Sequence, residues 1–144
     1  MRLPAAVLGL LLCAATAGAA EFVSVAEPAI LYDANSLQAR KLFVATRYLP
    51  LEQLVELDNW VKVRDSKGEI FWIEKRNLSR KRYVVVTAET ATVRSNWDDS
   101  APPVFTAARQ VALEWLGNAG VGWTKVRHRD GSTGYVKSNE IWGD

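Results

Sequence analysis

One stretch of the sequence occurs twice, and this repeat limits the possible folds more than any other feature. Residues 60–78 and 123–141 both contain Trp-x-Lys-Val-Arg, a glycine four residues after the arginine, and an aromatic residue followed by a β-branched one. The offset between these matching residues is constant, since Trp60 corresponds to Trp123 and Gly68 corresponds to Gly131. A constant offset over a whole supersecondary unit indicates an internal structural repeat.

Each copy has the pattern of a β-hairpin. Residues 60–64 alternate valine with large polar or aromatic residues, which is the two-residue period of a strand. Lys67-Gly68 and Asp130-Gly131 supply the turn, because glycine adopts a positive φ without steric cost. The returning strand is aromatic and β-branched in both copies. We expect a single helical turn or loop to follow, and then one last apolar residue, Leu78 or Ile141.

The repeat continues upstream of the hairpin, and each copy is expected to contain five or six short strands. In the first copy they lie near residues 22–26, 29–32, 42–47, 51–57, 60–65 and 69–74. In the second copy they lie near residues 83–87, 91–94, 103–107, 110–116, 123–128 and 133–137. Residues 37–47 favour a helix by propensity, but their counterpart contains Pro102-Pro103, so we predict a strand there as well. Short strands at this spacing are typical of a small barrel or sandwich.

We therefore predict an all-β protein made of two tandem small β-barrels. The expected domains are residues 21–79 and 83–144, joined by a basic linker at residues 80–82. Each domain has only about 60 residues, near the lower limit for independent stability, so we expect the two to pack against one another. Residues 75–82 include five basic residues. Such a run is explained either by a solvated linker or by a contact with phosphate or an acidic polymer.

Residues 1–20 have the pattern of a signal peptide. An apolar run centred on residues 7–12 is followed by small residues, so cleavage is expected after Ala19 or Ala20. The alternative, an uncleaved membrane anchor, is disfavoured because the apolar run is too short to span a bilayer comfortably. Cys13, the only cysteine, is preceded by leucine, where lipid attachment requires a small residue, and it leaves with this segment. The mature chain is expected to be periplasmic or secreted, without disulfides.

Charge and hydropathy exclude several kinds of partner. The formal net charge is +2, and loss of Arg2 with the signal peptide lowers it to +1. This balance does not suggest binding to nucleic acid or to an anionic membrane surface. No second apolar span follows, so we expect no membrane span after cleavage, and we expect the mature chain to be a monomer.

Three motifs of the second copy resemble bacterial SH3-like (SH3b) domains. Residues 91–95 resemble the N-V-R-S strand that opens such domains, residues 122–126 resemble G-W-x-K-V, and residues 131–141 resemble the closing G-x-x-G-[YW]-[VI] pattern. The first copy is more diverged, but residues 29–33 and 59–63 fit. The resemblance covers nearly the whole mature chain. It implies two tandem SH3-like barrels and an exported envelope protein of the kind found in Gram-negative bacteria.

The sequence also departs from related patterns. Residues 96–98 are Asn-Trp-Asp, where the bacterial family usually has Gly-Pro-Ser. Eukaryotic SH3 domains bind proline-rich helices on stacked aromatic residues and a proline, and Tyr32, Trp60 and Trp123 match aromatic positions of that platform. The positions of its proline and last tyrosine hold charged or polar residues, namely Glu74, Asn77, Lys137 and Glu140. A proline-rich ligand bound in the usual way is therefore not expected.

The residues do not form a catalytic pattern. His128 is the only histidine and lies between two arginines, without an evident cysteine, serine or second histidine partner. A zinc site needs three or four ligands, which one histidine does not anchor. Asp98 and Asp99 are adjacent in a loop, so they are better explained as solvated turn residues than as an acid–base pair. We therefore expect no enzymatic activity, no cofactor and no metal.

The six tryptophans are the better indication of function. Three of them lie on apolar strands or at a strand end and are expected in the core: Trp72, Trp115 and Trp142. Trp60 and Trp123 begin their strands beside a turn, where a core position and an exposed ligand shelf are both open. Trp97 lies in a polar loop, where it either plugs a barrel end or the inter-domain seam, or contacts a partner.

The candidate ligand-binding residues are Tyr32 and Trp60 in the first domain, and Trp97 and Trp123 in the second. We expect a non-enzymatic binding or adaptor module of the cell envelope. It would dock a peptide or protein segment, from peptidoglycan or from another envelope protein, on an aromatic groove. The alternative is a structural component of an envelope protein assembly that binds no free ligand.

Overall fold

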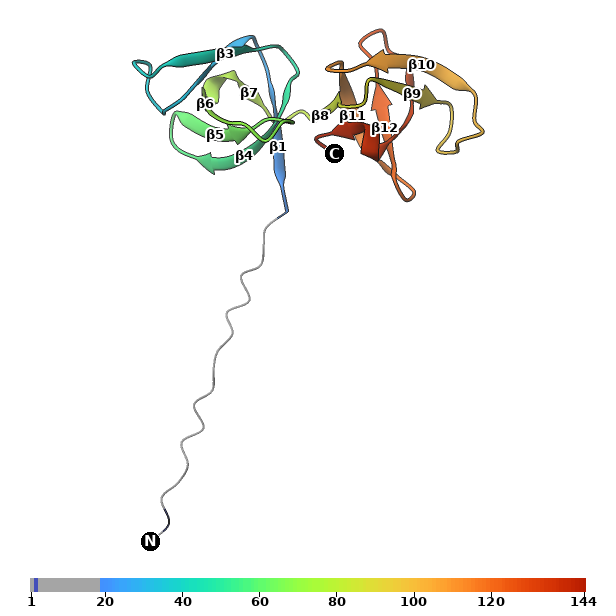
Figure 1. Cartoon of the computed structure of the whole chain (residues 1–144), viewed down its shortest axis with the longest axis horizontal. Coiled ribbons are helices and arrows are strands. Elements are labelled where there is room, and N and C mark those ends of the chain that lie inside the picture. The colour runs from blue at the N-terminus through green and yellow to red at the C-terminus, as the bar shows by residue number, and fades with distance from the viewer. Residues whose placement is uncertain (1, 3–18) are drawn as a thin grey trace.

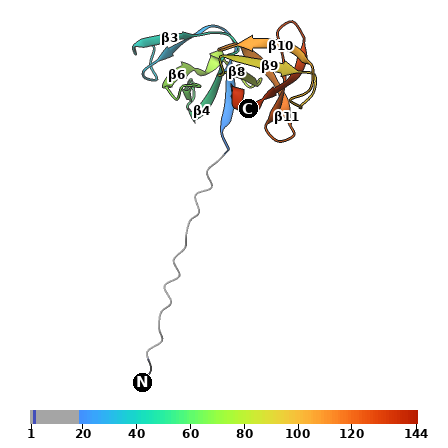
Figure 2. The same ribbon diagram turned by 45° about the vertical axis from the view of Figure 1, so that its right-hand side comes forward.

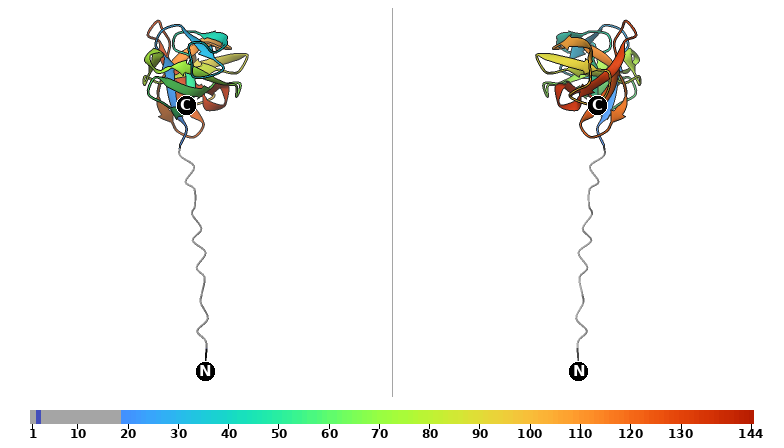
Figure 3. Two further views of the ribbon diagram at one scale, coloured as in Figure 1. Left: turned by 90° about the vertical axis from the view of Figure 1, so that its left-hand side faces the viewer. Right: turned by 90° about the vertical axis from the view of Figure 1, so that its right-hand side faces the viewer.

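The computed structural model describes residue 2 and residues 19–144. The expected signal peptide, residues 1–20, lies almost wholly outside the described residues. The rest of the chain forms two β-sheet units side by side, one for each repeat (Figure 1). Seen along the line that joins them, one unit lies behind the other (Figure 3).

The first repeat is a single antiparallel sheet of seven strands, and one 3₁₀ turn precedes the last strand. The elements are β1 (Glu21–Val25), β2 (Ala29–Tyr32), β3 (Lys41–Ala45), β4 (Pro50–Glu56), β5 (Trp60–Arg64), β6 (Ile70–Glu74), η1 (Lys75–Asn77) and β7 (Leu78–Ser79). Their order in the sheet is β3-β2-β6-β5-β4-β1-β7. The chain thus forms a sheet built mainly from hairpins, and after η1 it returns to the first strand, β1.

The second repeat has the same plan. Its elements are β8 (Tyr83–Val86), β9 (Thr90–Arg94), β10 (Pro103–Ala108), β11 (Ala112–Ala119), β12 (Trp123–Arg127), β13 (Thr133–Lys137), η2 (Ser138–Glu140) and β14 (Ile141–Trp142). The sheet order is β10-β9-β13-β12-β11-β8-β14, which matches the first repeat strand for strand. The sequence repeat is therefore a structural repeat, and the predicted all-β tandem arrangement is confirmed.

The two sheets are not closed into barrels, and in this respect the prediction was wrong. Among the described residues, the outermost strands β3 and β7 do not pair with each other, and neither do β10 and β14. The last apolar residue of each repeat begins a two-residue strand, in which Leu78 pairs with Val25 and Ile141 pairs with Val86. Each sheet therefore keeps two edges, one at β3 or β10 and the other at the two-residue strand β7 or β14.

Each sheet curls around its own apolar core. Strands alternate inward and outward residues, so Val61 and Val63 of β5 are buried while Trp60 and Lys62 face outward. The first core consists of Val23, Val25, Ala29, Leu31, Ala45, Leu51, Val61, Val63, Phe71 and Ile73. The second consists of Val84, Val86, Ala91, Val93, Ala107, Leu113, Val126, Val136 and Ile141. Burying one such valine or leucine contributes about 1.5–3 kcal/mol before conformational entropy is counted.

The two repeats meet around Arg82, which directly precedes β8. Its guanidinium carbon lies 5.2 Å from the ring centroid of Phe22 in β1 and 4.5 Å from that of Trp115 in β11. A guanidinium nitrogen donates a hydrogen bond to the carbonyl oxygen of Gly143 at 2.7 Å. Burial lowers the pKa of Arg82, and the charge of Asp144 opposes this shift. Arg82 therefore joins an aromatic residue of each repeat and the C-terminal residues in one cluster.

The other basic residues near the linker behave differently. Three of them form exposed ion pairs: Lys75 with Glu56, Arg76 with Glu74, and Lys81 with Glu114. The solvated-linker interpretation suits these three residues, because exposed pairs contribute little to stability. It does not suit Arg82, whose side chain forms part of the seam.

The last residues of the chain complete this seam. Trp142 packs edge-to-face on Phe22, with ring centroids 5.1 Å apart. Gly143 has a φ of 108°, and a Cβ there would lie 3.0 Å from the carbonyl oxygen of Tyr83 and 3.2 Å from Cβ of Pro50. The C-terminus consequently lies at the junction of the two repeats (Figure 1 and Figure 2). Among the described residues, no helix is long and apolar enough to cross a membrane.

Candidate ligand-binding site

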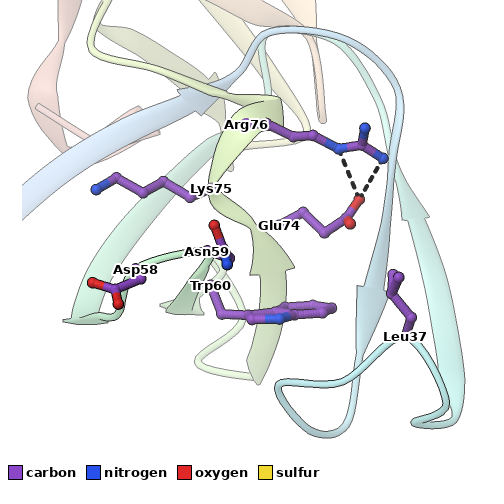
Figure 4. Close-up of a pocket in the computed structure, with 7 residues that line it drawn as sticks. All are labelled: Leu37, Asp58, Asn59, Trp60, Glu74, Lys75 and Arg76. Atoms are coloured by element: carbon purple, nitrogen blue, oxygen red, sulfur yellow. Dashed lines mark hydrogen bonds and ion pairs between the residues drawn. The ribbon is translucent and has the colours of Figure 1, made fainter.

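An open hollow lies beside Trp60 in the first repeat. Its volume is about 640 Å³. Seven residues line it: Leu37, Asp58, Asn59, Trp60, Glu74, Lys75 and Arg76. They come from the loop before β3, the turn between β4 and β5, the start of β5, the end of β6 and η1. The hollow therefore belongs to the first repeat alone (Figure 4).

Trp60 forms the aromatic wall of this hollow. Its indole is half-buried and packs edge-to-face on Tyr32, with ring centroids 5.3 Å apart and an interplanar angle of 85°. This is a favourable geometry for two aromatic quadrupoles. Tyr32 itself is only 5% exposed, so it fixes the orientation of Trp60 from behind. The structure thus brings these two predicted residues together, with Trp60 as the one that faces solvent.

Leu37 forms an apolar wall that sequence reasoning missed. The indole of Trp60 extends toward it (Figure 4), and its side chain is 56% exposed. The available signal was local, because Leu37 is the only large apolar residue in the polar loop 33–40. An exposed leucine opposite a tryptophan provides a place where a ligand can bury apolar surface.

The rim of the hollow carries both signs of charge. Glu74 accepts hydrogen bonds from Nη2 and Nε of Arg76 at 3.1 and 3.3 Å. Lys75 pairs with Glu56 at 2.6 Å, and its hydrogen bond and charge lower the pKa of Glu56. Because the Arg76 side chain is 78% exposed, its pair with Glu74 is weak and easily exchanged for a ligand group.

The corresponding place in the second repeat is covered. Trp123 is half-buried, and Nζ of Lys137 lies 6.0 Å from its ring centroid. Lys137 also pairs with Asp99 at 2.8 Å. Lys137 stands where the first repeat has Glu74, 63 residues earlier, and Asp99 stands where it has Leu37, 62 residues earlier, because the second repeat has one more residue in the turn before Trp123. An ion pair therefore replaces the open combination of acid and leucine seen beside Trp60.

Trp97 lies on the surface of the second repeat. Its side chain is 48% exposed, and its ring rests on Gly120, where a Cβ would come within 1.9 Å of the indole. Its loop is ordered by Asp98, whose carboxylate accepts hydrogen bonds from the backbone and hydroxyl of Ser100 at 2.9 Å. These bonds lower the pKa of Asp98. Trp97 thus covers a turn of its own repeat, and the four predicted residues do not form one groove.

The three tryptophans expected in the core lie at its margin. Trp72 is half-buried on the outer face of β6, because its neighbours Phe71 and Ile73 occupy the inward positions. Trp115 is partly buried against the second core and also contacts Arg82. Trp142 packs in the seam between the repeats. The alternation of inward and outward residues, more than hydrophobicity, decides these positions.

Residues considered for catalysis have other contacts. Nδ1 of His128 lies 3.2 Å from the carboxylate of Asp130, within one turn. Asp98 orders the Trp97 loop, while the adjacent Asp99 pairs with Lys137, so the two carboxylates act separately. Within residues 19–144, no three histidine, cysteine or carboxylate side chains gather as a metal site would require.

Comparison with protein families matches one model twice. The model is described as "Bacterial SH3 domain", and it matches residues 25–80 and 88–143. The chain belongs to the bacterial SH3 domain family. Bacterial SH3 domains are binding modules for cell-wall components and are typical of extracellular or envelope proteins. In this tandem SH3 protein the two matches coincide with the two seven-stranded sheets.

Comparison with solved structures finds two chains, titled "Structure of NlpC2 from Trichomonas vaginalis" and "Structure of NlpC1 from Trichomonas vaginalis". NlpC2 is 14% identical with a TM-score of 0.41, and the match covers 88% of this chain and 49% of that one. NlpC1 is 17% identical with a TM-score of 0.41, and the match covers 96% of this chain and 51% of that one. The tandem SH3 protein thus spans about half the length of these structures. Comparison with curated proteins gives no match.

Proposed function

We propose that this tandem SH3 protein is a non-catalytic binding module of the bacterial envelope that docks a short peptide in the hollow beside Trp60. The observation that carries the proposal is the hollow itself, in which a half-buried indole faces an exposed leucine, Leu37. Tryptophan held in a preformed pocket commonly dominates binding energy. Because Tyr32 already fixes the indole, little conformational freedom is lost when a ligand binds.

The charges at the rim favour a peptide that carries both amino and carboxylate groups. Glu74, with a side chain 19% exposed, is placed to accept an ammonium group. Arg76 presents a planar guanidinium suited to a carboxylate. A peptidoglycan stem peptide has both groups, and a segment of another envelope protein has them at its termini. The proposed mechanism is therefore exchange of the Glu74–Arg76 pair for two ligand contacts over the Trp60 ring.

In the second repeat, Trp97 and Trp123 form the proposed secondary contacts. Trp97 offers an exposed face now, while Trp123 becomes available when the pair between Lys137 and Asp99 opens. Export fits this function, because β1 begins at Glu21 and cleavage after Ala19 or Ala20 would leave the fold whole. In this proposal the protein works as a monomer in the periplasm or outside the cell.

A titration with a soluble disaccharide–tetrapeptide from peptidoglycan tests the proposal. We expect the indole N–H signal of Trp60 to shift saturably in ¹H–¹⁵N spectra of the mature chain. Trp60→Ala should weaken binding at least about tenfold, as for an interfacial hot spot. Phe43→Ala removes a 58% exposed aromatic side chain outside the hollow and should leave binding unchanged. Equal binding by Trp60→Ala and wild type would refute the site.

A structural role in an envelope assembly is a second candidate, favoured by the edge of the first sheet. Strand β3 has a pairing partner on one side alone among the strands that the structure describes, and Phe43 and Val44 on it are 58% and 69% exposed. Exposed apolar edge strands are suited to pairing with a strand of another protein. If Val44→Lys abolishes recruitment to the envelope while Trp60→Ala does not, this second function replaces the first.

A further inference from the structure

A second, smaller hollow lies at the junction of the two repeats. Its volume is about 210 Å³. Tyr48 contributes one wall from the first repeat, Lys81 comes from the linker, and the remaining residues belong to the second repeat, with Glu114, Arg127 and Arg129 among them. The hollow therefore exists only when the two repeats are packed together.

Stacked tyrosines form the aromatic wall. The rings of Tyr48 and Tyr83 are 4.6 Å apart with an interplanar angle of 24°. Tyr48 has a φ of 72°, and Gln110 at the matching position of the second repeat has a φ of 73°. The turn thus imposes this strained conformation on the residue at this position in both repeats. Only in the first repeat does the side chain of that residue, Tyr48, stack across the seam. Arg47 lies over the Tyr48 ring at 5.0 Å and adds positive charge nearby.

The charges that line the hollow are unbalanced. Lys81, Arg127 and Arg129 are cationic, while Glu114 is the one carboxylate among its lining residues. Glu114 is shared, since it lies 3.7 Å from Lys81 Nζ and 3.6 Å from Arg127 Nη1. Both distances exceed the 2.7–2.9 Å that is usual for a charge-assisted hydrogen bond. Each cation therefore keeps donors that Glu114 does not satisfy.

Arg129 strengthens this imbalance. Its side chain forms no ion pair with any residue that the structure describes. The nearby carboxylate of Asp130 instead accepts a hydrogen bond from the backbone of Ser132 at 2.8 Å and faces His128. The hydroxyl of Tyr83 and the carboxylate of Glu114 raise the pKa of Lys81, so its ammonium group remains charged.

We propose that this junction hollow binds a small ligand through an oxyanion, either a carboxylate or a phosphate. The guanidinium groups of Arg127 and Arg129 supply planar pairs of donors, and Lys81 supplies a mobile point charge. The stacked tyrosines give the ligand an apolar surface beside its charged group. Residues of both repeats line the hollow, so a bound ligand would also stabilise the arrangement in which the two repeats are packed together.

The test is a ¹H–¹⁵N titration of the mature chain with inorganic pyrophosphate and, separately, with citrate, each against sodium chloride at matched ionic strength. We expect saturable shifts at residues 127–131, Tyr48 and Tyr83 with at least one of the two anions. Saturation by pyrophosphate alone assigns a phosphate ligand, and saturation by citrate alone assigns a carboxylate. Shifts that match those of sodium chloride with both anions would overturn the proposal.

Matched variants make the test specific. Arg129→Gln removes a charge that forms no ion pair with a described side chain, so the fold should be unchanged. Affinity for the anion should fall about tenfold, as for loss of a charge-assisted contact. Arg40→Gln removes an equal charge from the first repeat, where Arg40 lines neither hollow, and should bind like wild type. Equal affinity of Arg129→Gln and Arg40→Gln would refute the site. The Trp60 hollow is a separate site, so the result of this test does not decide the outcome of the peptide titration at Trp60.

Discussion

Lys137 forms an ion pair with Asp99 at 2.8 Å over the ring of Trp123. The first repeat has Glu74 and Leu37 at the matching positions, and beside Trp60 an open hollow results. Two copies of one fold thus present different surfaces at the same place. The residues at these two positions differ in size and charge, and the turn before Trp123 has one more residue than the turn before Trp60.

Breaking this pair should expose Trp123 at little cost in stability. The side chains of Lys137 and Asp99 are 42% and 74% exposed, so Asp99→Asn should change the free energy of unfolding by less than about 1 kcal/mol. The 5-fluorotryptophan signal of Trp123 should respond more strongly to a soluble paramagnetic probe. Asp33→Asn, which removes an exposed pair with Arg40 in the first repeat, should leave that signal unchanged. No change in Asp99→Asn would show that the pair does not shield the ring.

Removing Arg82 should destabilise the tandem far more than removing its exposed neighbour Arg80. Arg82→Ala loses contacts with Phe22 and Trp115 and the hydrogen bond to Gly143. Cation–π contacts and a charged hydrogen bond of this kind together contribute about 2–4 kcal/mol. Urea unfolding should show this loss for Arg82→Ala and less than about 0.5 kcal/mol for Arg80→Ala. Similar midpoints for the two variants would mean that Arg82 is not the centre of the seam.

The strands of each repeat were predictable because their signals are local. Alternation in residues 60–64 and the glycines at 68 and 131 fix a hairpin without knowledge of the rest of the chain. Trp60 is a candidate ligand shelf on a signal that is also local, because it stands at the start of a strand beside a turn.

The remaining features depend on relations between distant residues. Whether the sheet closes depends on whether its two outermost strands pair with each other, and these strands are far apart in the sequence. In the sequence, Arg82 belongs to a run of basic residues, but its aromatic partners Phe22 and Trp115 lie about 60 and 33 positions away in the chain. Such contacts form when two folded repeats pack against each other, so the composition and periodicity of the sequence do not reveal them.

The matched turns at Tyr48 and Gln110 allow strain and stacking to be separated. Both residues have a positive φ, which costs roughly 1 kcal/mol for a residue other than glycine. Gln110→Gly should therefore stabilise the protein by up to about 1 kcal/mol. Tyr48→Gly relieves the same strain but loses stacking on Tyr83, worth about 0.5–1.5 kcal/mol. Thermal unfolding should rank Gln110→Gly above Tyr48→Gly, and the reverse order would contradict the role of the stack.

The loop that carries Trp97 should loosen in acid. Hydrogen bonds from Ser100 hold the pKa of Asp98 below its usual value of 3.8. A depressed folded-state pKa means that this stabilisation is full above 3.8 and is lost as the pH falls through the folded-state value. Carboxylate ¹³C titration should place Asp98 below 3.8, with the Trp97 indole signal moving in the same step. In Asp98→Asn that step should be absent.

The most direct test of the central claim is co-sedimentation of the mature chain, residues 21–144, with purified peptidoglycan sacculi. Each variant is first checked for folding by circular dichroism. We predict that wild type sediments with the sacculi, that Trp60→Ala stays in the supernatant, and that Trp123→Ala, altered at a shielded ring, retains most of its binding. If wild type remains soluble, or if folded Trp60→Ala sediments as wild type does, the Trp60 hollow is not a cell-wall binding site.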